Sequence, residues 1–123
     1  MRAHIIILAV FFALCSCKKE AGILGKKKLS GTVYYKNGVS AAYEPAPSAV
    51  VKIAYGASAA TSSFDQTLLS NADGSYKIEG LKRGDYYVWS EFTDTYGFVY
   101  STPGYLVDIN SKKGDLNLDI MLE

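Results

Sequence analysis

Apolar and polar residues alternate along most of the chain after residue 28, with the period of two that half-buried β-strands require. The alternation is clearest within residues 71–92, where Asp73-Gly74 forms one turn signal and Gly80 and Gly84 bracket a second. This stretch therefore predicts two neighbouring strands joined by a short corner, at 75–79 and 85–92.

The same alternation predicts further strands, separated by turns and small polar loops, at 29–35, 49–55, 66–70, 98–100 together with 105–109, and 116–122. The loop around Pro45 and Pro47 is excluded from the middle of a sheet because proline donates no backbone hydrogen bond. No segment after residue 17 places apolar residues at helical spacing over three turns. We therefore predict an all-β domain, a seven-stranded antiparallel Greek-key β-sandwich whose two sheets bury their apolar faces against each other.

The strand at 85–92 predicts how the core is built. Tyr86 and Val88 are assigned to its inward face, and Leu81 closes the end of the core. The pleat turns the alternate residues to the opposite face, and a second aromatic run follows along the neighbouring segment. These residues form the candidate ligand-binding surface, which consists of Tyr87, Trp89, Glu91, Tyr96, Phe98 and Tyr100.

Two interpretations of these aromatic residues stay open at the level of sequence. Exposed on a sheet face, the rings could stack on a sugar or clamp a peptide, because Tyr and Trp offer a large contact area with little rotamer entropy to lose. Alternatively, the loop at 93–104 folds over this face and buries the rings as a satellite of the core.

The N-terminus carries an uninterrupted apolar run of ten residues, 5–14. As a helix this run would rise about 15 Å, roughly half of a bilayer's hydrocarbon thickness, which indicates a signal peptide rather than a membrane span. The residues Leu14-Cys15-Ser16-Cys17 that end it resemble the bacterial lipobox. The resemblance implies cleavage after Ser16, attachment of a diacylglycerol to the Cys17 thiol and acylation of the new amino group. The alternative is an ordinary signal peptide with two spectator thiols or a disulfide.

Residues 18–28 change to Lys, Gly and Glu with few apolar side chains, a composition that buries too little surface to order itself. We predict a flexible tether here, so that the chain divides into a signal peptide (1–16), a lipidated cysteine with its tether (17–28) and the β-sandwich domain (29–123). The charged residues after Cys17 also resemble the surface-export signals of lipoproteins in the Bacteroidota. The lysines could equally act as a solvated spacer or contact anionic headgroups. The expected location is the cell envelope of a Gram-negative bacterium, anchored to the outer membrane in its periplasmic or surface-exposed leaflet.

Charge narrows the range of partners. The whole chain has a formal net charge of +1, but residues 29–123 hold seven basic and 11 acidic side chains, a net charge of −4. A mildly acidic domain lacks the basic surface that phosphate contacts require, so we expect no nucleic-acid partner.

The inventory of catalytic side chains is short. The histidine of the chain is His4 and its cysteines are Cys15 and Cys17, so the domain can assemble no Ser-His or Cys-His couple and no zinc site of the His and Cys type. Asp73 lies in a stretch similar to the start of a calcium loop, but a third carboxylate and the distal glutamate are missing. We therefore predict that the protein is not an enzyme and has no metal and no cofactor.

Four pieces of the domain, in their order and spacing, resemble the carboxypeptidase regulatory-like family: Gly31-Thr32-Val33, 47–53 (Pro-Ser-Ala-Val-Val-Lys-Ile), 71–78 (Asn-Ala-Asp-Gly-Ser-Tyr-Lys-Ile) and 80–88 (Gly-Leu-Lys-Arg-Gly-Asp-Tyr-Tyr-Val). The resemblance implies a seven-stranded, transthyretin-like (prealbumin-like, Ig-like) sandwich without catalysis of its own. The residues agree with it, since Tyr86 lies where its ring can be buried while its hydroxyl returns to the preceding turn, as in a tyrosine corner. The segment 93–104 is longer and more aromatic than the family's usual hairpin.

Domains of this family usually accompany an enzyme, a transporter or an adhesin. We therefore predict a lipid-anchored, non-catalytic binding or accessory module, attached to the membrane through its lipid, whose ligand is a glycan or an envelope protein. The alternative is a structural or spacer subunit of an outer-membrane uptake or adhesion complex. Binding predicts a defined surface site, whereas a structural role predicts a partner that co-purifies.

Overall fold

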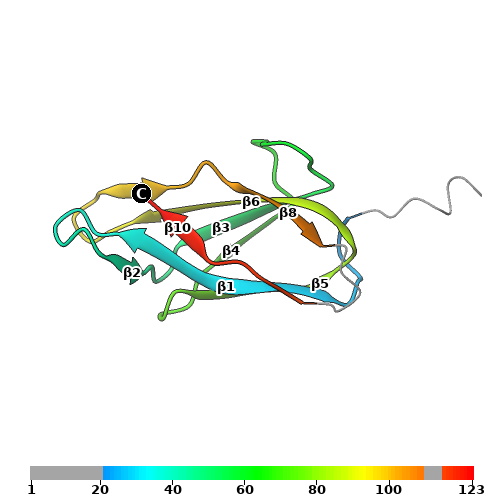
Figure 1. Ribbon diagram of the computed structural model, residues 1–123, viewed down its shortest axis with the longest axis horizontal. Coiled ribbons are helices and arrows are strands. Elements are labelled where there is room, and N and C mark those ends of the chain that lie inside the picture. Colours follow the sequence, from blue (N-terminus) through cyan, green and yellow to red (C-terminus); the bar gives the residue numbers. More distant parts are fainter. Residues whose placement is uncertain (1–20, 110–114) are drawn as a thin grey trace, which may run out of the picture.

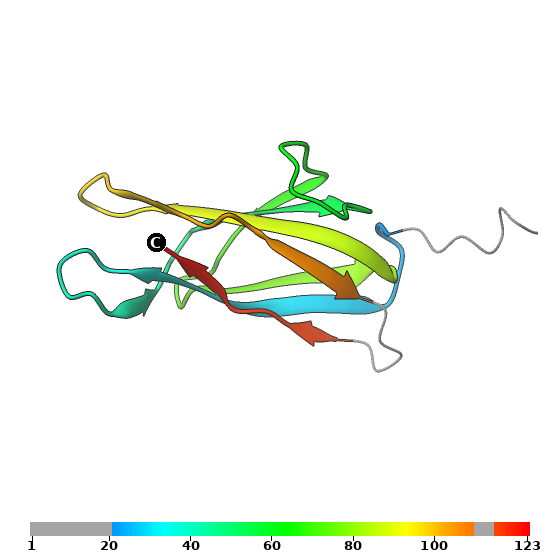
Figure 2. The same cartoon turned by 45° about the horizontal axis from the view of Figure 1, so that its top comes forward.

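The computed structural model describes residues 21–109 and 115–123, which fold into two facing β-sheets (Figures 1 and 2). This part of the chain contains no helix. Its strands are β1 (Lys27–Lys36), β2 (Tyr43–Pro45), β3 (Val50–Tyr55), β4 (Gln66–Leu69), β5 (Ser75–Leu81), β6 (Gly84–Thr93), β7 (Val99–Ser101), β8 (Tyr105–Ile109), β9 (Leu116–Asn117) and β10 (Ile120–Leu122). The predicted all-β architecture of two packed sheets is confirmed.

Strand β1 is the centre of the first sheet because it pairs with four other strands. Its N-terminal half pairs with β5, antiparallel, and with β9, parallel. Its C-terminal half pairs with β2, antiparallel, and with β10, parallel. The second sheet has the order β4-β3-β6, and β6 then pairs with β8 along its first half and with β7 along its second half, all antiparallel.

The number of strands and their directions differ from the prediction. In place of seven antiparallel strands, the described residues form ten, and β9 and β10 run parallel to β1. The strand predicted at 116–122 is broken at Leu118, whose backbone carbonyl lies directly against Gly31, where a larger residue would collide. At the break, Thr32 donates its N–H to Asp119 Oδ1 at 2.9 Å. The side chain of Asp119 thus replaces a backbone acceptor where the strand is interrupted.

The short strand β2 is an addition to the prediction. Its Pro45 lies at the edge of the first sheet, since β2 pairs with β1 and with no other described strand. Proline is tolerated at such an edge because its missing N–H faces away from the ladder. The sequence argument against a central strand at this loop therefore holds, although the loop does contain a strand.

The core lies between the two sheets. Leu81, Tyr86 and Val88 are fully buried, as the alternation in β5 and β6 predicted. They belong to one cluster with inward side chains from the other strands, which include Leu29, Val33, Val51, Ile53, Val107, Ile109, Ile120 and Leu122. The register of β6 is therefore the predicted one.

Tyr86 forms the predicted tyrosine corner. Its hydroxyl donates to the backbone carbonyl of Lys82 at 2.6 Å, in the turn that precedes β6. The same oxygen accepts the N–H of Gly22 at 3.0 Å. Burial raises the pKa of this phenol, so the hydroxyl stays protonated and remains a donor. One side chain therefore joins β6, the preceding turn and the start of the described chain.

The expectation of a flexible tether that reaches residue 28 is wrong for residues 21–28. Strand β1 starts inside this range, and the residues before it hydrogen-bond to the corner between β5 and β6. The N–H of Gly25 donates to the carbonyl of Gly80, and the N–H of Lys82 donates to the carbonyl of Gly22, both at 2.8 Å. The composition is misleading because glycine, which disfavours order in a free chain, also permits close approach of two backbones.

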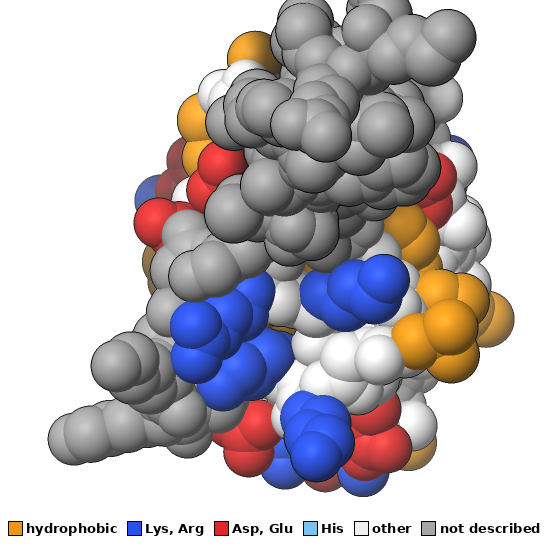
Figure 3. All heavy atoms as spheres, turned by 90° about the vertical axis from the view of Figure 1, so that its right-hand side faces the viewer, with side chains coloured by type: hydrophobic (Ala, Val, Ile, Leu, Met, Phe, Trp, Pro, Cys, Tyr) orange, Lys and Arg blue, Asp and Glu red, His pale blue; other side chains and the backbone are white. Residues whose placement is uncertain are grey.

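The described chain starts at one end of the sandwich, and the β1–β2 and β6–β7 loops lie at the other (Figures 1 and 2). Figure 3 looks onto the starting end, where Lys and Arg side chains stand next to Asp and Glu. The predicted signal peptide (1–16), Cys17 and the first tether residues lie outside the described part. Within that part, no helix has the length and apolar character needed to cross a membrane.

Candidate functional site

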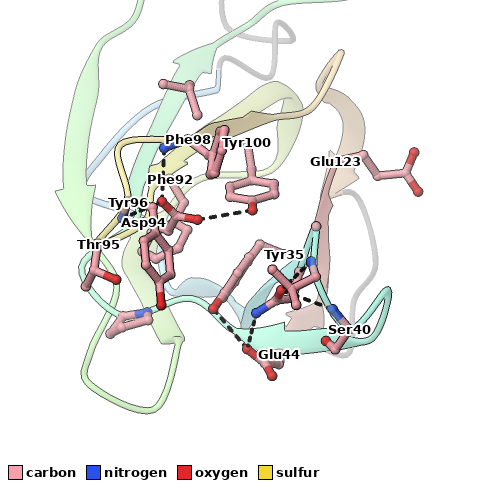
Figure 4. A pocket seen from close by; sticks show the side chains of 15 residues that line it. Tyr35, Ser40, Glu44, Phe92, Asp94, Thr95, Tyr96, Phe98, Tyr100 and Glu123 are labelled. Atoms are coloured by element: carbon pink, nitrogen blue, oxygen red, sulfur yellow. Dashed lines mark hydrogen bonds between the residues drawn. The ribbon is translucent and has the colours of Figure 1, made fainter.

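The loop that joins β1 to β2 and the loop that joins β6 to β7 lie at the end of the sandwich opposite Ala21 (Figure 2). A cleft opens between these two loops (Figure 4). Its volume is about 840 Å³, within the range usual for a binding site for a small ligand. We call it the end cleft. It is lined by residues of both loops, the adjoining strands and Glu123.

Three aromatic rings form the floor of the end cleft. The ring of Tyr35 lies 4.7 Å from that of Phe92 and 5.1 Å from that of Tyr100, measured between centroids. Phe92 and Tyr100 face each other across β6 and β7, with their rings 6.3 Å apart. Since all three also pack against the core, the floor is a rigid part of the fold.

Two carboxylates are held beside this floor by the hydroxyls of its tyrosines (Figure 4). Glu44 Oε2 accepts hydrogen bonds from the Tyr35 hydroxyl at 2.9 Å and from Asn37 Nδ2 at 3.2 Å. Asp94 Oδ2 accepts from the Tyr100 hydroxyl at 3.2 Å. The bond to Glu44 raises the pKa of the Tyr35 phenol, which therefore stays a donor to the carboxylate.

Asp94 also fixes the β6–β7 loop. Its Oδ1 accepts the backbone N–H groups of Tyr96 and Phe98, both at 2.9 Å. Gly97 closes the turn with a φ of 87°, a conformation that costs glycine little. As a result, the side chains of Tyr96 and Phe98 project from a defined loop and are 82% and 64% exposed.

The β1–β2 loop forms the opposite wall. Asn37 Oδ1 accepts the N–H of Val39 at 2.8 Å, and the Asn37 backbone bonds Ala41 and Ala42. The apolar side chain of Val39 is 91% exposed at the tip of this loop. The cleft is thus bordered by an aromatic loop on one side and by an aliphatic loop on the other. Each loop is fixed by a side chain, Asp94 or Asn37, that accepts hydrogen bonds from the backbone of its own turn.

The structure divides the six predicted surface residues between two places. Tyr96, Phe98 and Tyr100 line the end cleft, with Tyr100 buried in its floor. Tyr87, Trp89 and Glu91 lie on the outer face of β6, which is not the face that the cleft opens on. The six residues therefore do not share one surface, because Tyr100 lies on the inward face with Phe92 across the ladder.

On the outer face of β6 the Tyr87 ring is buried and the Trp89 ring is partly buried. Tyr87 is 5% exposed, and its hydroxyl donates to the carbonyl of Pro103 at 2.6 Å. Phe64, from the loop before β4, stacks on Tyr87 at 6.0 Å and lies 6.3 Å from Trp89. Lys52 Nζ lies 5.6 Å from the Trp89 ring centroid and adds a cation–π contact. Within the loop 93–104, Pro103 accepts the hydrogen bond of Tyr87. The ring contacts to Tyr87 and Trp89 come from Phe64.

Sequence analysis missed several residues of the end cleft, namely Tyr35, Asn37, Glu44, Phe92 and Asp94. The end of the first strand at residue 35 was predicted, and the unusual length and aromatic content of 93–104 were recognised. What the sequence did not show is that these two loops lie at the same end of the sandwich, since that depends on the pairing of β1 and β6 in different sheets.

The site offers no grouping of metal ligands. Among residues 21–109 and 115–123, no three His, Cys, Asp or Glu side chains come close enough to hold an ion. The cleft can instead accept hydrogen bonds through its carboxylates, donate them through its hydroxyls, and stack through its rings.

Comparison with known proteins agrees with the fold. No protein-family model and no curated protein matches the chain. BcpA, the major pilin subunit of Bacillus cereus, superposes with a TM-score of 0.57 at 16% sequence identity, over 80% of this chain and 30% of that one. A Pseudomonas aeruginosa protein named as a candidate carbohydrate binding protein superposes with a TM-score of 0.58 at 12% identity, over 82% of this chain and 91% of that one. At these identities the likeness establishes a shared β-sandwich fold.

Proposed function

We propose that this protein is a lipid-anchored, non-catalytic module of the cell envelope that binds a glycan in the end cleft. The observation that carries the proposal is the pair of exposed rings, Tyr96 and Phe98, at the mouth of a cleft with an aromatic floor. Aromatic faces pack against the apolar faces of sugar rings, and the nearby carboxylates accept hydrogen bonds from sugar hydroxyls.

The rigidity of the site supports binding. The floor is fixed by the core, and the loop that carries Tyr96 and Phe98 is fixed by Asp94. A ligand therefore finds its contacts already placed and orders few side chains on binding. The name of the Pseudomonas aeruginosa protein, which shares the fold over most of its length, points to the same class of ligand.

The orientation of the sandwich relative to the membrane, which follows from a lipid at Cys17, also supports the proposal. If Cys17 carries the lipid, five Cα–Cα steps separate it from Gly22, whose N–H bonds Tyr86, and they span at most about 18 Å when extended. The starting end of the sandwich then lies close to the membrane surface. The end cleft, at the opposite end, faces away from the membrane, where glycans are accessible (Figure 1).

The test is a calorimetric titration of the full-length protein in detergent with neutral, amino and acidic trisaccharides. Replacing both Tyr96 and Phe98 by alanine is expected to weaken binding about ten-fold or more, because two stacking contacts are lost. The control is Leu106→Ala, which removes an apolar side chain of similar exposure, 60%, on the distant strand β8. Binding by the double variant at wild-type affinity, or no binding of any trisaccharide, would refute the proposal.

A structural or spacer role is the second candidate. Strand β4 pairs with β3 alone among the described strands and carries Leu69, which is 60% exposed at this open edge. An exposed edge strand can pair with a strand of another chain. Likeness to a pilin subunit fits this role. A protein partner that co-purifies and is lost with Leu69→Lys, while Tyr96→Ala retains it, would favour the spacer role.

A further inference from the structure

We infer that the glycan bound by the end cleft carries free, positively charged amino groups, so that the ligand class is a cationic amino sugar. The inference rests on the proposed function and adds the charge of the ligand to it. It follows from the side chains that line the cleft, the way each carboxylate is held, and the rings at the mouth.

The charged residues of the end cleft are all acidic. Glu44, Asp94 and Glu123 line it, and no Lys or Arg side chain does so among the described residues. Lys36 follows Tyr35 in β1 and does not line the cleft, because the alternation of the strand turns it away from Tyr35, to the face of Tyr43. The cleft is therefore a concave region of negative potential, which attracts cations and repels acidic glycans.

Neutral donors hold the three carboxylates in place without cancelling their charge. Tyr35 and Tyr100 donate to Glu44 and Asp94 as described above, and the Tyr43 hydroxyl donates to Glu123 Oε1 at 2.6 Å. That last bond raises the pKa of the Tyr43 phenol, which stays a neutral donor. The ion pairs between other described residues, Lys28 with Asp115 and Lys77 with Glu79, involve no residue that lines the cleft. A ligand ammonium group is thus the cation that complements these carboxylates.

The exposed rings also favour a ligand that carries ammonium groups. Tyr96 and Phe98 stand at the mouth beside Asp94, which also bonds their backbone. An ammonium group over an aromatic face is attracted by the ring, and a neighbouring carboxylate adds to that attraction. A sugar with free amines can use both contacts at once, whereas an N-acetylated sugar keeps ring stacking and its hydroxyl hydrogen bonds but has no ammonium group to pair with a carboxylate.

The experiment compares three trisaccharides by calorimetry with the full-length protein in detergent: chitotriose with free amines, tri-N-acetylchitotriose and trigalacturonic acid. All titrations are run at the same pH of about 5.5. We expect chitotriose to bind about ten-fold more tightly than its acetylated form and trigalacturonic acid to bind most weakly, with the preference falling as salt is added.

A variant that removes a carboxylate charge tests whether the acidic side chains cause the preference for chitotriose. Glu44→Gln keeps the size of the side chain and an oxygen that can accept from Tyr35 and Asn37, and it removes one charge of the cleft. It should weaken the binding of chitotriose more than that of tri-N-acetylchitotriose and so lower the preference for chitotriose, whereas Glu79→Gln, outside the cleft, should keep the wild-type preference. Equal affinity of the wild type for both sugars would overturn the inference and leave glycan binding intact. Binding of none of the three would overturn the proposed function itself.

Discussion

Replacing Tyr86 by alanine is expected to lower the free energy of unfolding by about 3–5 kcal/mol, a large part of the whole stability of a domain of this size. The Tyr86 ring is fully buried in the core, and its hydroxyl bonds both Lys82 and Gly22. The change therefore leaves a cavity and two backbone groups without their partner. Urea titration followed by circular dichroism measures the loss.

Two further variants separate the contributions of ring and hydroxyl. Tyr86→Phe keeps the ring and removes the hydroxyl, at an expected cost of about 1–3 kcal/mol, and it should speed hydrogen exchange at Gly22. Tyr96→Ala, the matched control on an 82% exposed tyrosine, should cost less than about 0.5 kcal/mol. A loss below about 1 kcal/mol for Tyr86→Ala would contradict the assigned packing of β6.

Replacing Cys17 by serine is expected to move the protein from the membrane pellet to the soluble fraction. The lipobox resemblance implies three acyl chains on this residue, which bury far more surface than the single chain that gives only reversible attachment. Described residues provide no membrane-spanning helix as a substitute. Fractionation and incorporation of labelled palmitate measure the effect.

Cys15→Ser is the matched control for the anchor, because Cys15 is expected to leave with the signal peptide. It should pellet and incorporate label as the wild type does. If the Cys17 variant still pellets, or if the wild type incorporates no palmitate, the protein is not a lipoprotein of this kind.

The strand that the sequence predicted best is β6. Its alternation of Tyr86 and Val88 with Tyr87 and Trp89 assigned the inward face correctly, because a strand buried on one side leaves a period of two in its residue types. The tyrosine corner followed from the position of Tyr86 after a glycine-bounded turn. Local sequence was sufficient because these contacts form within one corner.

Features that depend on distant contacts were missed. The break at Leu118 requires Gly31 to lie against it, and the ordering of Gly22 and Gly25 requires the corner at Gly80. In each case a glycine is the site of contact, and a glycine in sequence indicates freedom rather than contact. The resemblance to the carboxypeptidase regulatory-like family remains a prediction alongside the confirmed two-sheet fold.

The candidate site was predicted only in part, because it too depends on contacts between residues that are distant in the sequence. Of the six predicted residues, Tyr96 and Phe98 are exposed rings, as the binding interpretation requires. Trp89 was placed with them because the pleat turns it away from the core, but pleating does not show that Phe64 returns from another loop to lie against it. Which outward residues are covered is decided by loops, and loop paths carry no periodic signal.

Mapping the ligand contacts by NMR, in the free and the bound protein, tests most directly whether the end cleft is the binding site. Backbone amide resonances of the labelled protein, titrated with the tightest-binding trisaccharide, should shift most in the loops around Asn37 and Asp94 that form the cleft. The indole N–H of Trp89, on the outer face of β6, should stay unchanged and serves as an internal control. Shifts centred on Trp89 and Phe64, with the cleft loops unaffected, would contradict the account and move the site to the outer face.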